Sequence, residues 1–228
     1  MILPLLLAAL AVPARAATSM QVAGSVVRSK EWIIRRGANK EEEFVGDVRY
    51  NAAGSSFSSD WALFKHADRS WLARGSVLLR RRLSDGSKIE ARGERAGHNE
   101  DTKRGYLEPA AGKRVVFTRT PPGEAPDRGE SGRADWDGEN SLTLSGTAKI
   151  WGPRLELAAD EAVYDRSMGR LSLRGGRPVV HKLVGDWTTA VKADHIVATD
   201  SPRRIEAHGK AQGWLVFHDQ AKLKELTK

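Results

Sequence analysis

Apolar and polar residues alternate with a period of two along much of this chain. Between positions 142 and 150, every second residue is apolar or glycine, and the residues between them are threonine, serine or lysine. Such alternation predicts a β-strand with one buried face. Similar stretches occur at 44–50, 71–79, 171–175 and 205–211, and no long stretch has a helical period. The chain is therefore predicted to be all-β.

A glycine stands in the apolar phase of each of these strands. The five positions are Gly46, Gly75, Gly146, Gly175 and Gly209. Glycine weakens a strand interior, so its recurrence in mid-strand needs a structural reason. We expect each glycine to mark a bend, with a close backbone approach on the concave side of a curved sheet.

A second sequence element precedes the glycines at a constant distance. Its clearest copy is the Ala-Asp-Glu-Ala-Val-Tyr-Asp segment at 159–165, and weaker copies begin at 94 and 132. The distance of 15 residues separates Asp60 from Gly75, Asp160 from Gly175 and Asp194 from Gly209. Turn residues lie between the strands, as in the Asp-Arg-Ser-Met-Gly segment at 165–169. The repeats predict about ten to twelve strands, mostly antiparallel and paired in sequence order.

The ends of the chain and one internal stretch depart from the repeat. Residues 1–16 are apolar and end in Ala-Arg-Ala, which predicts a signal peptide cleaved before Ala17. The alternative is an uncleaved membrane anchor, although the apolar run is shorter than the roughly 20 residues that span a bilayer. The Pro/Gly-rich stretch 121–130 is predicted to be a mobile loop within a single domain covering 17–220, and 221–228 a charged tail.

The repeated phrase resembles a known family. Ala-Asp-x-Ala-x-Tyr-Asp followed by a turn and a glycine-centred strand is similar to the recurring motif of the OstA/LptA/LptC family of periplasmic lipopolysaccharide-transport proteins. The match is clearest over 159–179 and looser over 59–79 and 194–213. The resemblance implies an open twisted antiparallel β-jellyroll built from repeated strand pairs, with an apolar slot between its two faces.

The resemblance also implies a function and partners. An LptA-like protein binds the lipid A acyl chains of lipopolysaccharide and forms part of a bridge from the inner to the outer membrane. Its neighbours would be other β-jellyroll Lpt subunits joined by edge-to-edge strand addition, and a head-to-tail homo-oligomer is a further arrangement of the same kind. An LptC-like subunit anchored in the inner membrane and facing the periplasm, and a structural β-repeat protein at the cell surface that binds no lipid, remain alternatives.

The apolar phase of the strands supplies the candidate lipid contacts. Burial of each CH₂ group is worth roughly 0.8 kcal/mol, so an apolar slot suits acyl chains. In a jellyroll the same phase lines both slot and core, and the sequence alone does not separate them. The candidates are Phe44, Val48, Val77, Leu79, Leu142, Leu144, Ile150, Leu155, Leu157, Val163, Leu171 and Leu173.

Charge and candidate chemistry add little to this interpretation. The net charge of +8 fits either solubility or attraction to phosphate-bearing lipid, and we predict no nucleic-acid partner because the longest basic run is the triplet at 80–82. The chain has no cysteine, and its histidines lack metal-site spacing. The repeated aspartates have no clustered partner carboxylates, so neither metal nor cofactor is predicted. No nucleophile or phosphate-loop motif occurs, and we predict that the protein is not an enzyme.

Overall fold

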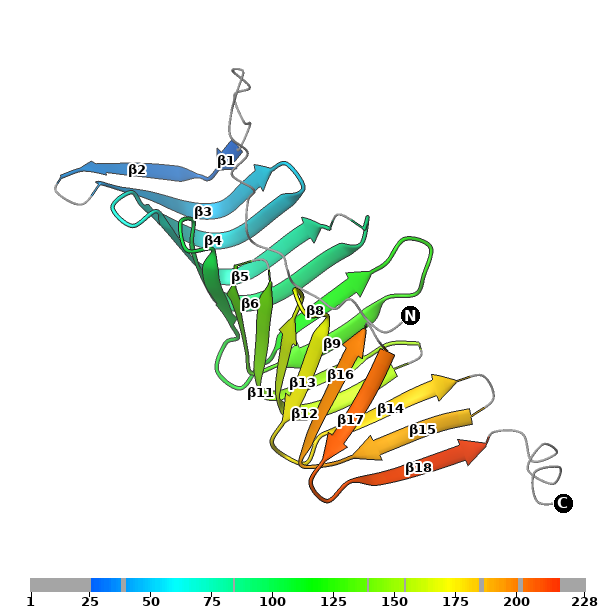
Figure 1. The fold of residues 1–228 in the computed structure, drawn as a ribbon. Helices are drawn as coiled ribbons and strands as arrows, with labels where there is room; N and C mark the ends of the chain where they lie inside the picture. The colour runs from blue at the N-terminus through cyan, green and yellow to red at the C-terminus, as the bar shows by residue number, and fades with distance from the viewer. Residues whose placement is uncertain are drawn as a thin grey trace, which may run out of the picture.

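The protein is all-β and consists of one 18-stranded sheet in which all strand pairs are antiparallel. This computed structural model describes residues 26–37, 40–83, 85–138, 140–153, 155–184, 187–200 and 203–217, none of which is helical. The strands, which step along the molecule from β1 to β18 (Figure 1), are β1 (Val26–Arg28), β2 (Glu31–Arg36), β3 (Lys40–Ala52), β4 (Ser55–Lys65), β5 (Ser70–Arg82), β6 (Lys88–Asn99), β7 (Arg104–Glu108), β8 (Val115–Thr120), β9 (Asp127–Ser131), β10 (Arg133–Asp137), β11 (Ser141–Trp151), β12 (Leu155–Asp165), β13 (Arg170–Arg174), β14 (Val179–Val184), β15 (Trp187–Lys192), β16 (His195–Asp200), β17 (Arg203–His208) and β18 (Gln212–Phe217).

The sheet folds along one line into two walls. Wall A consists of β2, β7, β10, β13, β16 and β17, and wall B of β1, β8, β9, β14, β15 and β18. The long strands β3, β4, β5, β6, β11 and β12 cross the line and contribute one half to each wall. This explains why there are more strands than the ten to twelve predicted, since several predicted strands are interrupted at the bend.

Three of the predicted glycines, Gly46, Gly75 and Gly146, form the bend as β-bulges, while Gly175 and Gly209 lie between strands. Gly46 and Asp47 of β3 face only Asp60 of β4, and Gly146 and Thr147 of β11 face only Asp160 of β12. Both residues of each bulge have positive φ, for example 70° at Gly146 and 64° at Thr147. Two successive left-handed residues turn the strand sharply, and glycine is the residue that accepts the first of them without steric cost.

The aspartate of the repeat faces the glycine across the bend. A β-carbon on Gly75 would lie 2.4 Å from Oδ2 of Asp60, and one on Gly175 would lie 2.8 Å from Oδ2 of Asp160. Both aspartates are exposed. The expected close approach therefore exists, but it lies on the solvent side of the bend and not on the concave side as predicted, because the left-handed φ reverses the direction of the missing side chain.

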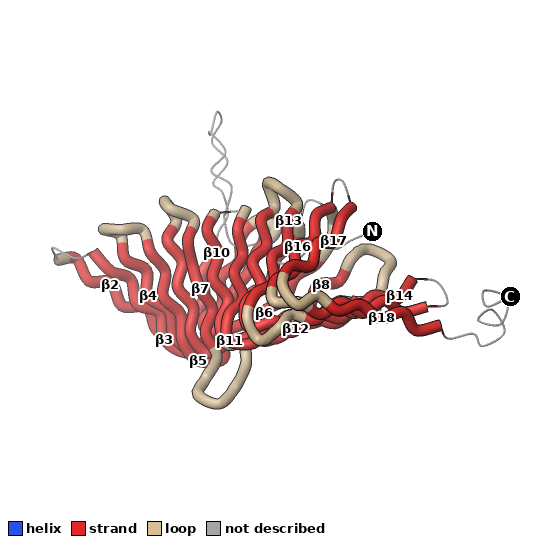
Figure 2. The backbone as a smooth tube through the Cα atoms, turned by 60° about the horizontal axis from the view of Figure 1, so that its bottom comes forward, coloured by secondary structure: helices blue, strands red, loops and turns tan. Residues whose placement is uncertain are grey.

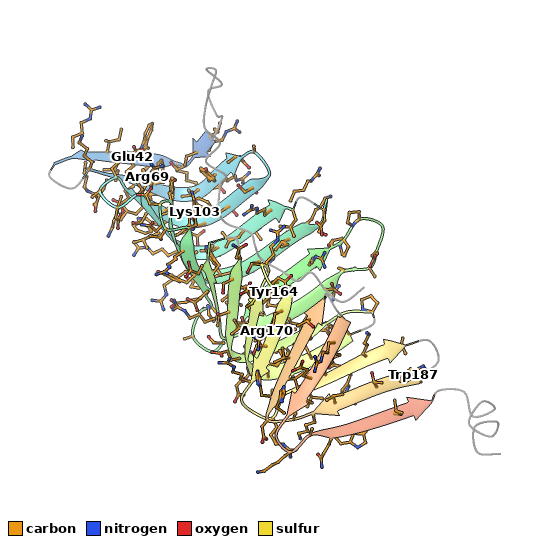
Figure 3. All side chains as sticks on the ribbon, viewed as in Figure 1. Glu42, Arg69, Lys103, Tyr164, Arg170 and Trp187 are labelled. Carbon is orange, nitrogen blue, oxygen red and sulfur yellow. The ribbon has the colours of Figure 1, made fainter. Side chains whose placement is uncertain are left out.

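Between the walls lies the hydrophobic core. Figure 2 shows the walls diverging from the bend, with β14 and β18 reaching away from β13, β16 and β17 at the C-terminal end. One large core cluster includes residues from β5 to β16, and a smaller one at the N-terminal end contains Phe44, Val48 and Ala62. Tyr164 on β12 lies near the middle of the molecule, and Trp187 on β15 lies near its C-terminal end (Figure 3).

Three further glycines make room for aromatic rings on neighbouring strands. Gly129 is the cross-strand partner of Phe117, and a β-carbon there would lie 2.2 Å from the phenyl ring. Gly105 is similarly covered by Trp136, and Gly97 by Tyr106. A side chain at any of these positions would displace a large ring, so the glycines are required for packing across the sheet.

The boundaries predicted from the sequence are only partly comparable with the structure. The loop predicted at 121–130 ends earlier, because β9 begins at Asp127 and pairs with β8 and β11. The signal peptide predicted at 1–16 and the tail at 221–228 lie outside the described residues. Within the described residues, no helix is long and apolar enough to cross a membrane.

Candidate functional site

The inner surfaces of the two walls form a continuous apolar lining. Because directly paired residues of neighbouring strands point to the same side of a sheet, the register defines the row of side chains on each wall. The row on wall A contains Leu107, Ala134, Leu144, Ala162, Leu173 and Ile196. The row on wall B contains Leu79, Ala91, Phe117, Gly129, Ile150, Leu157 and Val180.

Most of the predicted lipid contacts lie on this lining and are buried. Nine are core residues, namely Phe44, Val48, Val77, Leu79, Leu142, Leu144, Ile150, Leu157 and Leu173. Leu155 and Leu171 are partly buried and pack against the same core. Leu144, Leu173 and Phe117 are each 1% exposed, so side chains fill the middle of the space between the walls.

Val163 lies on the other side of the sheet from the rest of the predicted set. It pairs with Thr143 of β11 and Ser172 of β13, whereas its chain neighbours Ala162 and Tyr164 pair with the inner leucines. The prediction that Val163 lines the apolar slot is therefore wrong. The prediction rested on residue type, but this apolar valine occupies a position in the polar phase of its strand.

The sequence analysis missed the lining contributed by β7, β8, β10 and β16. Phe117, Leu107, Trp136 and Ile196 are all buried in the main core cluster. A signal was present for Phe117, because Val115 and Phe117 alternate with polar residues in a short strand. The strand has no central glycine, so it did not resemble the repeat.

An aromatic cluster joins the two walls at the N-terminal end. The ring of Trp71 lies 6.0 Å from Phe44 and 4.7 Å from Phe64, both on wall A. It also lies 5.8 Å from Phe57 and 5.7 Å from Tyr50, which belong to wall B. Such pairs contribute beyond their buried area, so this cluster holds the walls together near one end.

Apolar residues of the lining become exposed toward both ends. At the C-terminal end, Leu215 of β18 is 60% exposed and Ile205 of β17 is 38% exposed. At the N-terminal end, Trp32 and Ile34 of β2 are 59% and 46% exposed. The lining is therefore closed in the middle of the molecule and open at its two ends, where apolar groups are in contact with solvent.

A half-buried histidine sits within the aromatic lining of wall A. Nδ1 of His98 accepts a hydrogen bond of 3.3 Å from the indole Nε1 of Trp136. Burial lowers the pKa of His98, and the positive charge of Lys103 lowers it further. The neutral imidazole that results is the form that accepts the Trp136 hydrogen bond.

Each end of the sheet presents strands with one unpaired edge. Among the described residues, β1 and β2 pair only with β3, while β17 pairs only with β16 and β18 only with β15. The unpaired N–H and C=O groups of such edges are templates for strand addition. Together with the exposed apolar side chains, they make each end suited to contact with another chain.

The described residues contain no group of histidine, aspartate and glutamate side chains arranged to hold a metal ion. Asp60 and Asp160 lie on separate strands, Asp194 lies directly before β16, and each of the three faces a glycine. The chemistry that the lining supports is the burial of apolar groups.

Comparison with known proteins gives a structural likeness and no match in sequence. No family model matches the sequence, and no curated protein matches it. Among the solved structures that match is the crystal structure of LptH from Pseudomonas aeruginosa, the LptA homologous periplasmic component of the conserved lipopolysaccharide transport device. It has 11% sequence identity, the match covers 57% of this chain and 95% of that chain, and the TM-score is 0.43. A likeness at this level does not by itself define the function of the chain.

Proposed function

We propose that this protein is a periplasmic lipid carrier that forms part of a bridge for lipopolysaccharide between the inner and outer membranes. The observation that carries the proposal is the continuous apolar lining between two walls, which is exposed at both ends of the molecule beside unpaired strand edges. An acyl chain entering at an end would contact Leu215 or Ile205 first and then the buried rows.

The filled interior determines how such a ligand would enter. Because Leu144 and Leu173 are almost completely buried, acyl chains would have to separate the walls in the middle of the molecule. The bend would make this possible, since the walls are joined along the bulges. The same filled interior favours a second candidate, a structural β-repeat protein that binds no lipid.

Photo-crosslinking distinguishes the two candidates. A photoreactive residue at Leu171, on the inner side of β13, is expected to capture lipid A in the purified protein. The matched control is Val163, an apolar residue on the adjacent strand that faces the other side of the sheet. Capture at Leu171 but not at Val163 supports lipid carriage, whereas equal labelling or none supports the structural protein. Leu144 against Thr143 provides the same comparison deeper in the core.

The two ends of the molecule are suited to head-to-tail stacking in a defined register. The backbone N–H of Lys30 donates to the carbonyl of Gly46 at 2.9 Å, and the backbone N–H of Asp194 donates to the carbonyl of Gly209 at 2.8 Å. Lys30 therefore occupies the same position beside its glycine as Asp194 does. The residue that follows also pairs with the residue before the glycine, as Glu31 does with Val45. The last strands, β17 and β18, thus have the glycine bend between them, and the first strands, β1 and β2, have the straight segment that lies opposite such a bend.

This relationship predicts the contacts between copies. If β1 and β2 of one copy continue the sheet beyond β18 and β17 of another, Val27 would pair with Gly213, Trp32 with Ala207, and Glu31 with His208. Each predicted pair joins residues that share a side of the sheet. A contact of this kind does not close on itself, so it produces a filament or bridge. The same edges would serve for addition of another β-jellyroll subunit.

Cysteine crosslinking tests the register, because the chain has no cysteine of its own. The double variant Val27→Cys/Gly213→Cys is expected to form a ladder of disulfide-linked copies on oxidation, since paired strand residues lie within disulfide distance. Moving one cysteine to Val26 places it on the other side of the sheet and should abolish the ladder. A monomer at all concentrations would contradict head-to-tail assembly without affecting the lipid experiment.

The periplasmic location is part of the same proposal. N-terminal sequencing of the mature protein distinguishes a form cleaved before Ala17 from an anchored, LptC-like form that retains Met1. The first result supports a bridge subunit free in the periplasm, and the second an inner-membrane subunit of the same pathway.

A further inference from the structure

The outer surface of wall B carries a hollow of about 800 Å³ near the free ends of β3 to β6 and β8. Two rows of side chains on the same side of the sheet line it. The first row contains Asn51, Ser56, Arg80, Glu90 and Thr118, and the second contains Arg82, Lys88 and Thr120. The hollow is thus separated from the apolar lining by the thickness of the sheet.

Positive charge is concentrated in the second row. Arg82 and Lys88 are directly paired across β5 and β6, and both are exposed. Like charges directly opposite each other destabilise a sheet. Neither side chain has an ion-pair partner among the described residues, so within that part of the chain the repulsion is left uncompensated.

The nearest carboxylate is already occupied by other cations. Glu90 accepts hydrogen bonds from Arg80 at 2.9 Å and from Arg92 at 2.6 Å. These hydrogen bonds, the one from Arg80 foremost, lower the pKa of Glu90, so it remains ionised and attached to them. Asp85, in the loop between β5 and β6, is likewise bound by Arg119. Neither carboxylate neutralises Arg82 and Lys88.

Hydroxyl and amide groups complete the lining. Thr120 is the cross-strand partner of Lys88, and Thr118 and Ser56 lie in the neighbouring row. Cations flanked by hydroxyl donors match a compact oxyanion with several acceptor oxygens. A phosphate monoester, with close to two negative charges at neutral pH, fits this description best.

We infer that this hollow is a binding site for a phosphate group, held by Arg82 and Lys88 with hydroxyl donors from β8. The phosphate would come either from a small phosphorylated molecule or from a phosphorylated lipid headgroup, because both present the same group. Binding of an anion between the two paired cations would also remove their repulsion and stabilise the sheet. The inference uses the outer surface only and does not depend on lipid carriage in the interior.

Calorimetric titration of the mature protein with inorganic phosphate tests the site, with chloride used to keep the ionic strength constant. We expect a dissociation constant on the order of 1 mM and an increase in melting temperature with phosphate. The variant Arg82→Gln/Lys88→Gln should weaken binding by about tenfold or more. The control Lys40→Gln/Lys113→Gln removes the same charge from two exposed positions away from the hollow and should leave binding unchanged.

Vesicle co-sedimentation separates the two sources of phosphate. Binding to phosphatidylcholine vesicles only when phosphatidic acid is added, and loss of this binding in Arg82→Gln/Lys88→Gln, would identify a lipid headgroup as ligand. Binding of inorganic phosphate without vesicle binding would identify a soluble phosphorylated molecule. The inference is overturned if neither probe binds, or if the control variant loses as much binding as the Arg82/Lys88 variant. Crosslinking at Leu171 should be unchanged in both variants.

Discussion

The carboxylate of Asp60 occupies the space where a β-carbon of Gly75 would stand. The distance from that position to Oδ2 is only 2.4 Å, and the same relationship links Asp194 to Gly209 at 2.5 Å. The 15-residue spacing in the sequence is therefore a direct contact across the bend between neighbouring strands. The effect on stability of a substitution at one of the two residues should therefore depend on the side chain at the other, and this dependence can be measured.

Substitution of Gly75 by alanine should destabilise the protein through both steric overlap and backbone strain. Gly75 has φ of 77°, a conformation that costs roughly 1–2 kcal/mol for a residue with a β-carbon. The overlap with Asp60 adds to this, so we expect a total loss of about 2–3 kcal/mol in urea denaturation.

Two further variants separate these contributions. Gly112 also has positive φ, 71°, but has no atom within 4 Å of the β-carbon position. Gly112→Ala should therefore show the strain alone, about 1 kcal/mol. In the background of Asp60→Gly, which removes the Asp60 β-carbon at 2.7 Å together with the carboxylate, the effect of Gly75→Ala should fall to the same value. An undiminished loss in that background would contradict the proposed contact.

Thr147 should be a position where glycine is stabilising. It has φ of 64°, which is a strained conformation for a β-branched residue. Thr147→Gly is expected to raise the free energy of unfolding by about 0.5 kcal/mol, because relief of strain exceeds the entropy that glycine adds to the unfolded chain. Thr143→Gly, in a regular part of the same strand, should instead destabilise. Loss of stability at both positions would show that the bulge is not strained.

Leu144 and Val163 should differ sharply although both belong to the predicted apolar set. Leu144 is 1% exposed in the core between the walls, so Leu144→Ala is expected to cost about 2–5 kcal/mol. Val163 faces the opposite side of the sheet, and Val163→Ala should cost less than about 1 kcal/mol. Equal losses in thermal denaturation would mean that the register of β12 is wrong.

His98 should make the stability of the protein depend on pH. Burial and Lys103 lower its pKa below the ordinary value of 6.5, whereas Glu100 acts in the opposite direction. The unfolded chain therefore binds more protons than the folded one as the pH falls below about 6.5, and the free energy of unfolding decreases there. Urea denaturation between pH 7.5 and 5 should show this decrease.

The variant His98→Gln identifies the group responsible for this pH dependence. It removes one titrating group and should reduce the slope, although it also loses some stability at neutral pH. The remaining slope is expected from His195, whose pKa is also lowered by burial and by Arg174. His181→Gln, at an exposed position on β14, should retain the slope of the original protein. A slope unchanged in His98→Gln would assign the effect to another group.

The sequence by itself determined the class of fold and the unit from which it is built. Alternation with a period of two is a local property, and it correctly indicated strands with one buried face at β5 and β11. The constant spacing of Asp60 and Gly75 was also readable, because both residues belong to adjacent strands joined by one turn. Nearly all residues predicted from these strands lie on the lining.

Only the tertiary structure decided which side each residue faces and how the walls meet. Val163 has the residue type of the lining but the phase of the outer surface, because the inner phase of β12 passes from Ala159 to Ala162 at Asp160, opposite the bulge of β11. The pairing of Arg82 with Lys88, and the contact of Trp71 with Phe57 across the walls, also depend on register and on the bend. The phase shift at the bend and the contacts between walls arise from pairings among distant segments, which local alternation does not specify.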